Sequence, residues 1–135
     1  MTSSFRFTVP GQPPSLNHIH KTVWRTDGAG NRYKGRAKEE EVTNYQLVAA
    51  NECRRARHDW QPPQVFNPRK GHGLIVIRYW FYLARALDVD NAMKVLNDPI
   101  KHAIEIDDSH FLPQAWGRET GHKRDARVEV EVIAA

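Results

Sequence analysis

The sequence predicts a single α/β domain of the α+β type, with helices packed on one sheet, and three patterns lead to this prediction. Apolar and polar residues alternate over 4–9 and over 127–132, which is typical of half-buried strands. Residues 74–83 are apolar on both faces, as in a central strand. Apolar residues recur at helical spacing over 37–58 and again after Asn91.

The first strand, residues 4–9, is expected to end at Pro10-Gly11. A long loop is expected over residues 10–35, because prolines and glycines recur there. Connections of this length without regular structure usually serve a function. The segment is basic, which suits contact with a DNA backbone. The residues that we expect to contact DNA are Lys21, Arg25, Arg32, Lys34 and Arg36.

A helix is predicted over residues 37–58, with a stripe of apolar residues that includes Val42 and Cys53. Cys53 is the only cysteine of the chain, so it cannot form an internal disulfide or a cysteine-based metal cluster. This agrees with a reducing cytoplasm. A second connection, residues 61–73, leads from the helix to the apolar strand 74–83.

The charges of the chain are unevenly distributed. Twenty Lys and Arg against sixteen Asp and Glu give a formal charge of +4. The window 88–108 holds six acidic and two basic residues and carries −4, which leaves +8 on the other residues. A metal-dependent nuclease needs such a pattern, because carboxylates hold the cations while the basic body attracts phosphates. A solvated acidic face on a basic protein is the alternative.

The acidic window begins where the apolar strand ends. Asp88 and Asp90 are two residues apart, so in extended chain they point to the same side. Asp90 is a suitable N-cap for a helix that starts at Asn91, and Lys94 and Asp98 follow on the same side of that helix. A capped amphipathic helix with an Asp–Lys pair also explains Asp90 and Lys94, but it leaves Asp88 unexplained.

Pro99 allows two geometries for this helix. An interior proline removes one hydrogen bond, so the helix could kink there. Alternatively, Asp98 caps a new helix whose first residue is Pro99, which turns Asp98 away from Lys94.

A second acidic element, Asp107-Asp108, follows the helix. By itself it fits a solvated turn. If it returns beside Asp88 and Asp90, four carboxylates crowd together, and two unit charges about 5 Å apart repel by about 3 kcal/mol at an effective dielectric constant of about 20. Lys94 would offset part of this negative charge, and hard divalent cations usually neutralise the rest. Such ions would polarise a scissile phosphate and activate water for hydrolysis.

The ordered set of these residues resembles the signature of the RusA family of Holliday junction resolvases. The set comprises Asp88-x-Asp90-Asn91-x-x-Lys94-x-x-x-Asp98, then Asp107-Asp108, and the opening Pro13-Pro14-Ser15-x-Asn17 after the first strand. The resemblance implies a small homodimeric α/β endonuclease with a mixed sheet of three to four strands and two main helices. It also implies that the protein uses Mg²⁺ or Mn²⁺ to cut four-way DNA junctions in recombination and repair.

Position by position, the resemblance implies roles for single residues. Asp88, Asp90 and Asp108 would be catalytic aspartates that hold the metal, with Asp107 as a further candidate ligand. Lys94 would be the catalytic lysine, which orients a phosphate oxygen or offsets charge in the transition state. The residues expected to support the site are Asn91, Asp98 and Asn17.

Two other functions fit the same sequence. In one, the chain binds junctions or DNA without cutting, and its acids only cap a helix. In the other, it is a metal nuclease that acts on RNA or single strands. No stretch is apolar enough for a membrane span or a signal peptide. The sequence therefore predicts one cytoplasmic domain, 1–135, of bacterial, prophage or phage origin, in which a two-fold dimer would match the symmetry of a junction.

Overall fold

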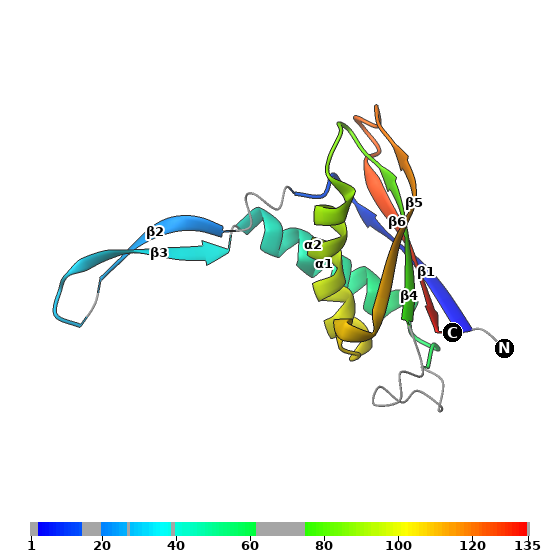
Figure 1. Cartoon of the computed structure of the whole chain (residues 1–135), viewed down its shortest axis with the longest axis horizontal. Coiled ribbons are helices and arrows are strands. Elements are labelled where there is room, and N and C mark those ends of the chain that lie inside the picture. Colours follow the sequence, from blue (N-terminus) through cyan, green and yellow to red (C-terminus); the bar gives the residue numbers. More distant parts are fainter. Residues whose placement is uncertain (1–2, 15–19, 27, 39, 62–74, 135) are drawn as a thin grey trace.

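The computed structural model describes residues 3–14, 20–26, 28–38, 40–61 and 75–134. The predicted α/β domain is confirmed: four strands form a mixed sheet in the order β1-β6-β4-β5, and α1 and α2 pack on one of its faces (Figure 1). In chain order the elements are β1 (Ser3–Pro10), β2 (His20–Thr26), β3 (Arg32–Lys38), α1 (Glu40–Ala56), β4 (Ile75–Tyr82), α2 (Val89–Ile104), the short 3-10 helix η3 (Asp108–His110), β5 (Phe111–Glu119) and β6 (Arg127–Ala134).

The direction of the strands decides where the candidate site residues lie. β6 is antiparallel to both β1 and β4, whereas β5 runs parallel to β4. A parallel pair needs a crossover connection, and α2 supplies it. The chain leaves β4 at one end of the sheet, passes along α2 and enters β5 at the other end (Figure 1). The start of α2 and the start of β5 are therefore at opposite ends of the domain.

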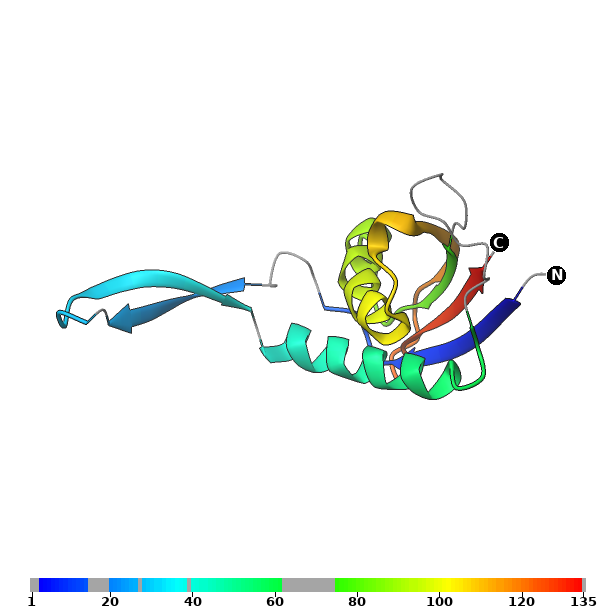
Figure 2. The ribbon, with the colours of Figure 1, turned by 90° about the horizontal axis from the view of Figure 1, so that it is seen from below.

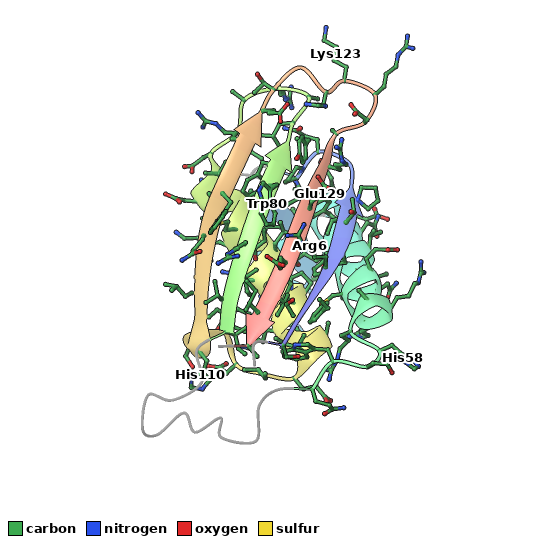
Figure 3. The ribbon with its side chains drawn as sticks, turned by 90° about the vertical axis from the view of Figure 1, so that its right-hand side faces the viewer. Arg6, His58, Trp80, His110, Lys123 and Glu129 are labelled. Carbon is green, nitrogen blue, oxygen red and sulfur yellow. The ribbon has the colours of Figure 1, made fainter. Side chains whose placement is uncertain are left out.

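The core lies between the helices and the sheet. Alternate residues of β4 are fully buried, including Tyr79 and Phe81, as a central strand requires. α1 buries the predicted stripe that contains Val42 and Cys53, and α2 buries Leu96 and Ile100. The opposite face of the sheet is not covered by these helices, as Figure 3 shows. No described helix is both long and apolar enough to cross a membrane.

β2 and β3 form a two-stranded antiparallel ribbon that projects from the domain (Figures 1 and 2). The prediction of a loop over residues 10–35 is therefore wrong for residues 20–26 and 32–35. The ribbon turns near Gly30, whose φ of 84° favours glycine. A strand is recognised in a sequence by an apolar face, and residues 32–38 present alternate cationic residues instead. The backbone pairing of the ribbon consequently left no signal in the sequence.

The structure corrects three further expectations. α1 begins at Glu40 and not at residue 37, because residues 37 and 38 belong to β3. The N-cap of α2 is Asp88 and not Asp90. β5 was not predicted, since Pro113 and a β-bulge near Trp116 break its alternation.

α2 runs unbroken from Val89 to Ile104, with Pro99 buried inside it. The alternative in which Asp98 caps a new helix at Pro99 is therefore wrong. Asp98 therefore belongs to the same helix as Asp90 and Lys94.

Candidate active site

Asp88 and Asp90 lie where β4 has ended and α2 begins. One oxygen of Asp88, Oδ1, accepts the backbone N–H of Asp90 at 3.0 Å, and Oδ2 accepts Nδ2 of Asn91 at 3.2 Å. Both aspartates are exposed. The helix dipole favours negative charge at this position, and Asn91 fixes the orientation of the Asp88 carboxylate. Two carboxylates are thus presented to solvent at the start of a helix.

Lys94 lies one helical turn after Asp90 and is exposed. Among the ion pairs found in the described ranges, none involves Lys94, so the Asp90–Lys94 pair that would explain both residues without a function is not formed. Asp98, one turn further, lies 3.7 Å from Nε2 of His102. The ammonium group of Lys94 is therefore available to an anion that approaches the start of α2.

Asp107 and Asp108 lie at the other end of α2. Asp107 accepts the backbone N–H of Ser109 at 3.2 Å and lies 3.3 Å from Nζ of Lys101. Its hydrogen bonds with Ser109, and then the Lys101 ammonium, lower the pKa of the Asp107 carboxyl. The hydrogen bond to Asp107 and the nearby charge of Asp108 raise the pKa of Lys101 in turn. This acidic pair already has a cation of its own chain beside it.

The expected convergence of four carboxylates is wrong for a single chain. A helix of 16 residues is about 24 Å long, and the parallel crossover places Asp88 and Asp108 beyond its opposite ends. In the described part of the chain, no three His, Cys, Asp or Glu side chains are grouped so that they could hold a metal ion. Spacing along the sequence could not show this, because it depends on β5 being parallel to β4.

The chemistry of the Asp88–Asp90 pair nevertheless fits a magnesium ion. Mg²⁺ keeps several water molecules and is usually bound in proteins by one or two carboxylates together with substrate phosphates. Both carboxylates are exposed and two residues apart, so neither is withdrawn into the core. Two carboxylates alone would leave most coordination positions of such an ion to water, to substrate oxygens or to other ligands.

The residues predicted to contact DNA lie on the projecting ribbon. Lys21 and Arg25 belong to β2, and Arg32, Lys34 and Arg36 to β3. The three β3 residues occupy alternate positions, and alternate positions of a strand share one face. Asn17, expected to support the site, lies outside the described residues.

Gln12 has a positioning role that the sequence did not reveal. Its Oε1 accepts the backbone N–H of Ala84 at 2.8 Å, and its Nε2 donates to the carbonyl of Arg85 at 3.2 Å. On the other side of the same segment, the backbone N–H of His122 donates to the carbonyl of Leu83 at 2.9 Å. These bonds hold the segment that leads to Asp88. They join residues far apart in sequence, so no local pattern indicates them.

Comparison with protein-family models finds no match, and no curated protein matches the chain. Among solved structures, the chain is similar to 2C-methyl-D-erythritol 2,4-cyclodiphosphate synthase from Plasmodium vivax, with 11% identity and a TM-score of 0.36 over 99% of this chain and 96% of that one. It is also similar to IspF from Plasmodium falciparum in a CDP complex, with 11% identity and a TM-score of 0.34 over 98% and 95%. Similarity at this level carries no argument about function.

Proposed function

We propose that this protein is a divalent-metal-dependent endodeoxyribonuclease of RusA type, which hydrolyses phosphodiester bonds in four-way DNA junctions. One observation carries the proposal: the start of α2 presents Asp88, Asp90 and Lys94 to solvent, in the order of the family's signature. A helix that only needed a cap would use Asp88 for it. Asp90 then adds only a favourable charge in the first turn of α2, and neither Asp90 nor Lys94, both exposed, forms an ion pair among those found in the described ranges.

Each residue at the start of α2 has a distinct part in this proposal. Asp88 and Asp90 would hold Mg²⁺ or Mn²⁺, which activates water and stabilises the leaving oxygen. Asn91 keeps the Asp88 carboxylate in one orientation through its 3.2 Å hydrogen bond. Lys94 would donate to a non-bridging phosphate oxygen, where its charge offsets the charge that develops in the transition state.

The projecting ribbon would be the arm that contacts DNA. A two-stranded β-ribbon fits the major groove of duplex DNA. The cationic residues of β3 follow one another at alternate positions, about 7 Å apart, so one face of the ribbon can follow a phosphate backbone. The ribbon extends away from α1, α2 and the sheet, which leaves both its faces clear of the domain (Figure 2).

A homodimer would give Asp108 a part in the same chemistry. In a two-fold pair with antiparallel α2 helices, the start of α2 in one copy lies beside the end of α2 in the other. Asp108 of one chain would then complete the Asp88–Asp90 site of its partner, and two such sites would cut two strands. We place this activity in the cytoplasm, with a bacterial, prophage or phage gene as its source.

The test is the cleavage of a labelled synthetic four-way junction, with and without Mg²⁺ or Mn²⁺, by the wild type and by Asp90→Asn. We expect cleavage only by the wild type with metal, and junction binding by both proteins. Binding without cleavage under every metal condition would contradict the proposal and favour a non-catalytic binding protein. Faster cleavage of RNA or of single strands than of junctions would contradict the proposed substrate.

A further inference from the structure

We propose that the groove beside Lys123 and Arg124, at the end of the sheet where α2 begins, is a second binding site for a DNA backbone. This inference rests on the proposed function, because it names the surface that receives the strand next to Asp88 and Asp90. The loop between β5 and β6, residues 120–126, forms one wall of the groove. Nothing in the sequence alone pointed to this loop.

Four cationic side chains at this end of the sheet are exposed and have no carboxylate partner among the ion pairs found in the described ranges. They are Arg85, Arg118, Lys123 and Arg124. Figure 3 shows Lys123 extending into solvent beyond the sheet. Arg127 differs from them, since Asp125 binds it at 3.1 Å. Exposed cations grouped at one end create a local positive potential that attracts phosphate.

The groove has a volume of about 480 Å³ and is lined by Gly11, Gln12, Lys123, Arg124, Asp125 and Arg127 among others. Asp125 pairs with Arg127, whereas Lys123 and Arg124 form no ion pair among those found in the described ranges. A second hollow, of about 420 Å³, lies on the uncovered face of the sheet beside Arg6, Trp80 and Glu129 (Figure 3). There, Nε of Arg6 is 3.1 Å from Glu131, and Glu129 adds a further negative charge. A phosphate would therefore bind in the groove at the end of the sheet and not in the hollow on its face.

Hydrogen bonds connect both walls of this groove to the proposed active site. Gln12 binds the segment at Ala84 and Arg85 from one wall, and the loop binds it from the other through His122 and Leu83. The backbone N–H of Gly11 also donates to the carbonyl of Ala126 at 2.8 Å, which joins the two walls. Asp88 follows Arg85 by three residues. A DNA strand bound in the groove would thus be positioned by the same protein segment that leads to Asp88.

The experiment compares Lys123→Ala/Arg124→Ala with Arg54→Ala/Arg55→Ala, which removes the same charge from the last turn of α1. That turn lies at the far end of the domain, near His58 in Figure 3. Both pairs are introduced into Asp90→Asn, so that a labelled four-way junction stays uncut. Its dissociation constant is measured from low to moderate salt, and the melting temperature of each variant is measured to confirm folding.

We expect Lys123→Ala/Arg124→Ala to weaken junction binding about tenfold or more, and to reduce the slope of log K against log salt by about 1.8, because each neutralised phosphate contributes about 0.9. The Arg54→Ala/Arg55→Ala control should change the affinity less than about threefold by the same reasoning. Equal effects of the two pairs, or no effect of the first, would overturn the inference. Cleavage by the wild type is assayed separately. A wild type that cuts no DNA would refute the proposed function, whereas the salt dependence of binding tests only the groove.

Discussion

Gln46 of α1 donates a hydrogen bond from Nε2 to the carbonyl oxygen of Val95 in α2, at 2.8 Å. Val95 is four residues before Pro99, so its carbonyl is the one that the proline deprives of a helical N–H partner. The side chain of Gln46 takes the place of that missing donor. This explains how α2 continues through Pro99 without ending. The same hydrogen bond links α1 to α2.

Gln46→Ala is expected to destabilise the protein by about 1–3 kcal/mol, because the partly buried Val95 carbonyl loses its donor. In a Pro99→Ala background the loss should be smaller, since alanine at position 99 supplies the helical N–H. Urea unfolding of the wild type, both single variants and the double variant measures this coupling. An equal cost of Gln46→Ala in both backgrounds would show that the hydrogen bond does not compensate for Pro99.

The sequence allowed the layered core to be predicted, because burial leaves periodic patterns in β1, α1, β4 and β6. It did not reveal β5, whose alternation is interrupted by Pro113 and a bulge, or the ribbon, whose β3 strand has cationic residues at alternate positions. The same limit applies to the candidate site. Asp88 and Asp90 could be placed together because they are neighbours in sequence. The position of Asp108 depends on the direction of β5, which no local pattern specifies.

Cys53 should be unreactive in the native protein. Burial raises the pKa of its thiol from 9.0 to about 12, although Arg57 and Arg54 lower it slightly. The thiolate is the reactive form, so a disulfide reagent at pH 8 should label native protein about 100-fold or more slowly than urea-unfolded protein. Rapid labelling of the native chain, with Cys53→Ala as the blank, would contradict this burial.

The same thiol predicts a loss of stability at alkaline pH. Its folded pKa lies above the unfolded value, so its contribution is complete below about pH 8.5. It is then lost as the pH rises toward about 12, because the unfolded chain ionises first. The free energy of unfolding should therefore fall less steeply between pH 9 and 11 in Cys53→Ala than in the wild type. Parallel curves for the two proteins would contradict the prediction.

The ribbon should contribute to DNA binding and not to the stability of the domain. Changing Lys21, Arg25, Arg32 and Lys34 to alanine is expected to weaken junction binding and to flatten its salt dependence by about 0.9 for each phosphate that the ribbon no longer neutralises. The melting temperature should stay unchanged, because the ribbon projects away from the core (Figure 1). An unchanged salt slope with intact folding would exclude the ribbon from the DNA interface.

The separation of Asp88 and Asp90 from Asp108 leads to a prediction about the proposed dimer. Asp90→Asn and Asp108→Asn should each abolish junction cleavage as purified proteins. If each site combines Asp88 and Asp90 of one copy with Asp108 of the other, a mixed dimer of the two variants has one site with both changes and one site with neither. Subunit exchange between the inactive variants should therefore restore cleavage, to at most about half of the wild-type rate per mixed dimer.

Mixing Asp88→Asn with Asp90→Asn is the matched control and should restore no cleavage, because both residues come from the same chain in each site. A site built from one chain predicts no recovery in either mixture, so recovery confined to the first mixture requires the shared arrangement, and its absence despite proven subunit exchange would remove Asp108 from the proposed active site.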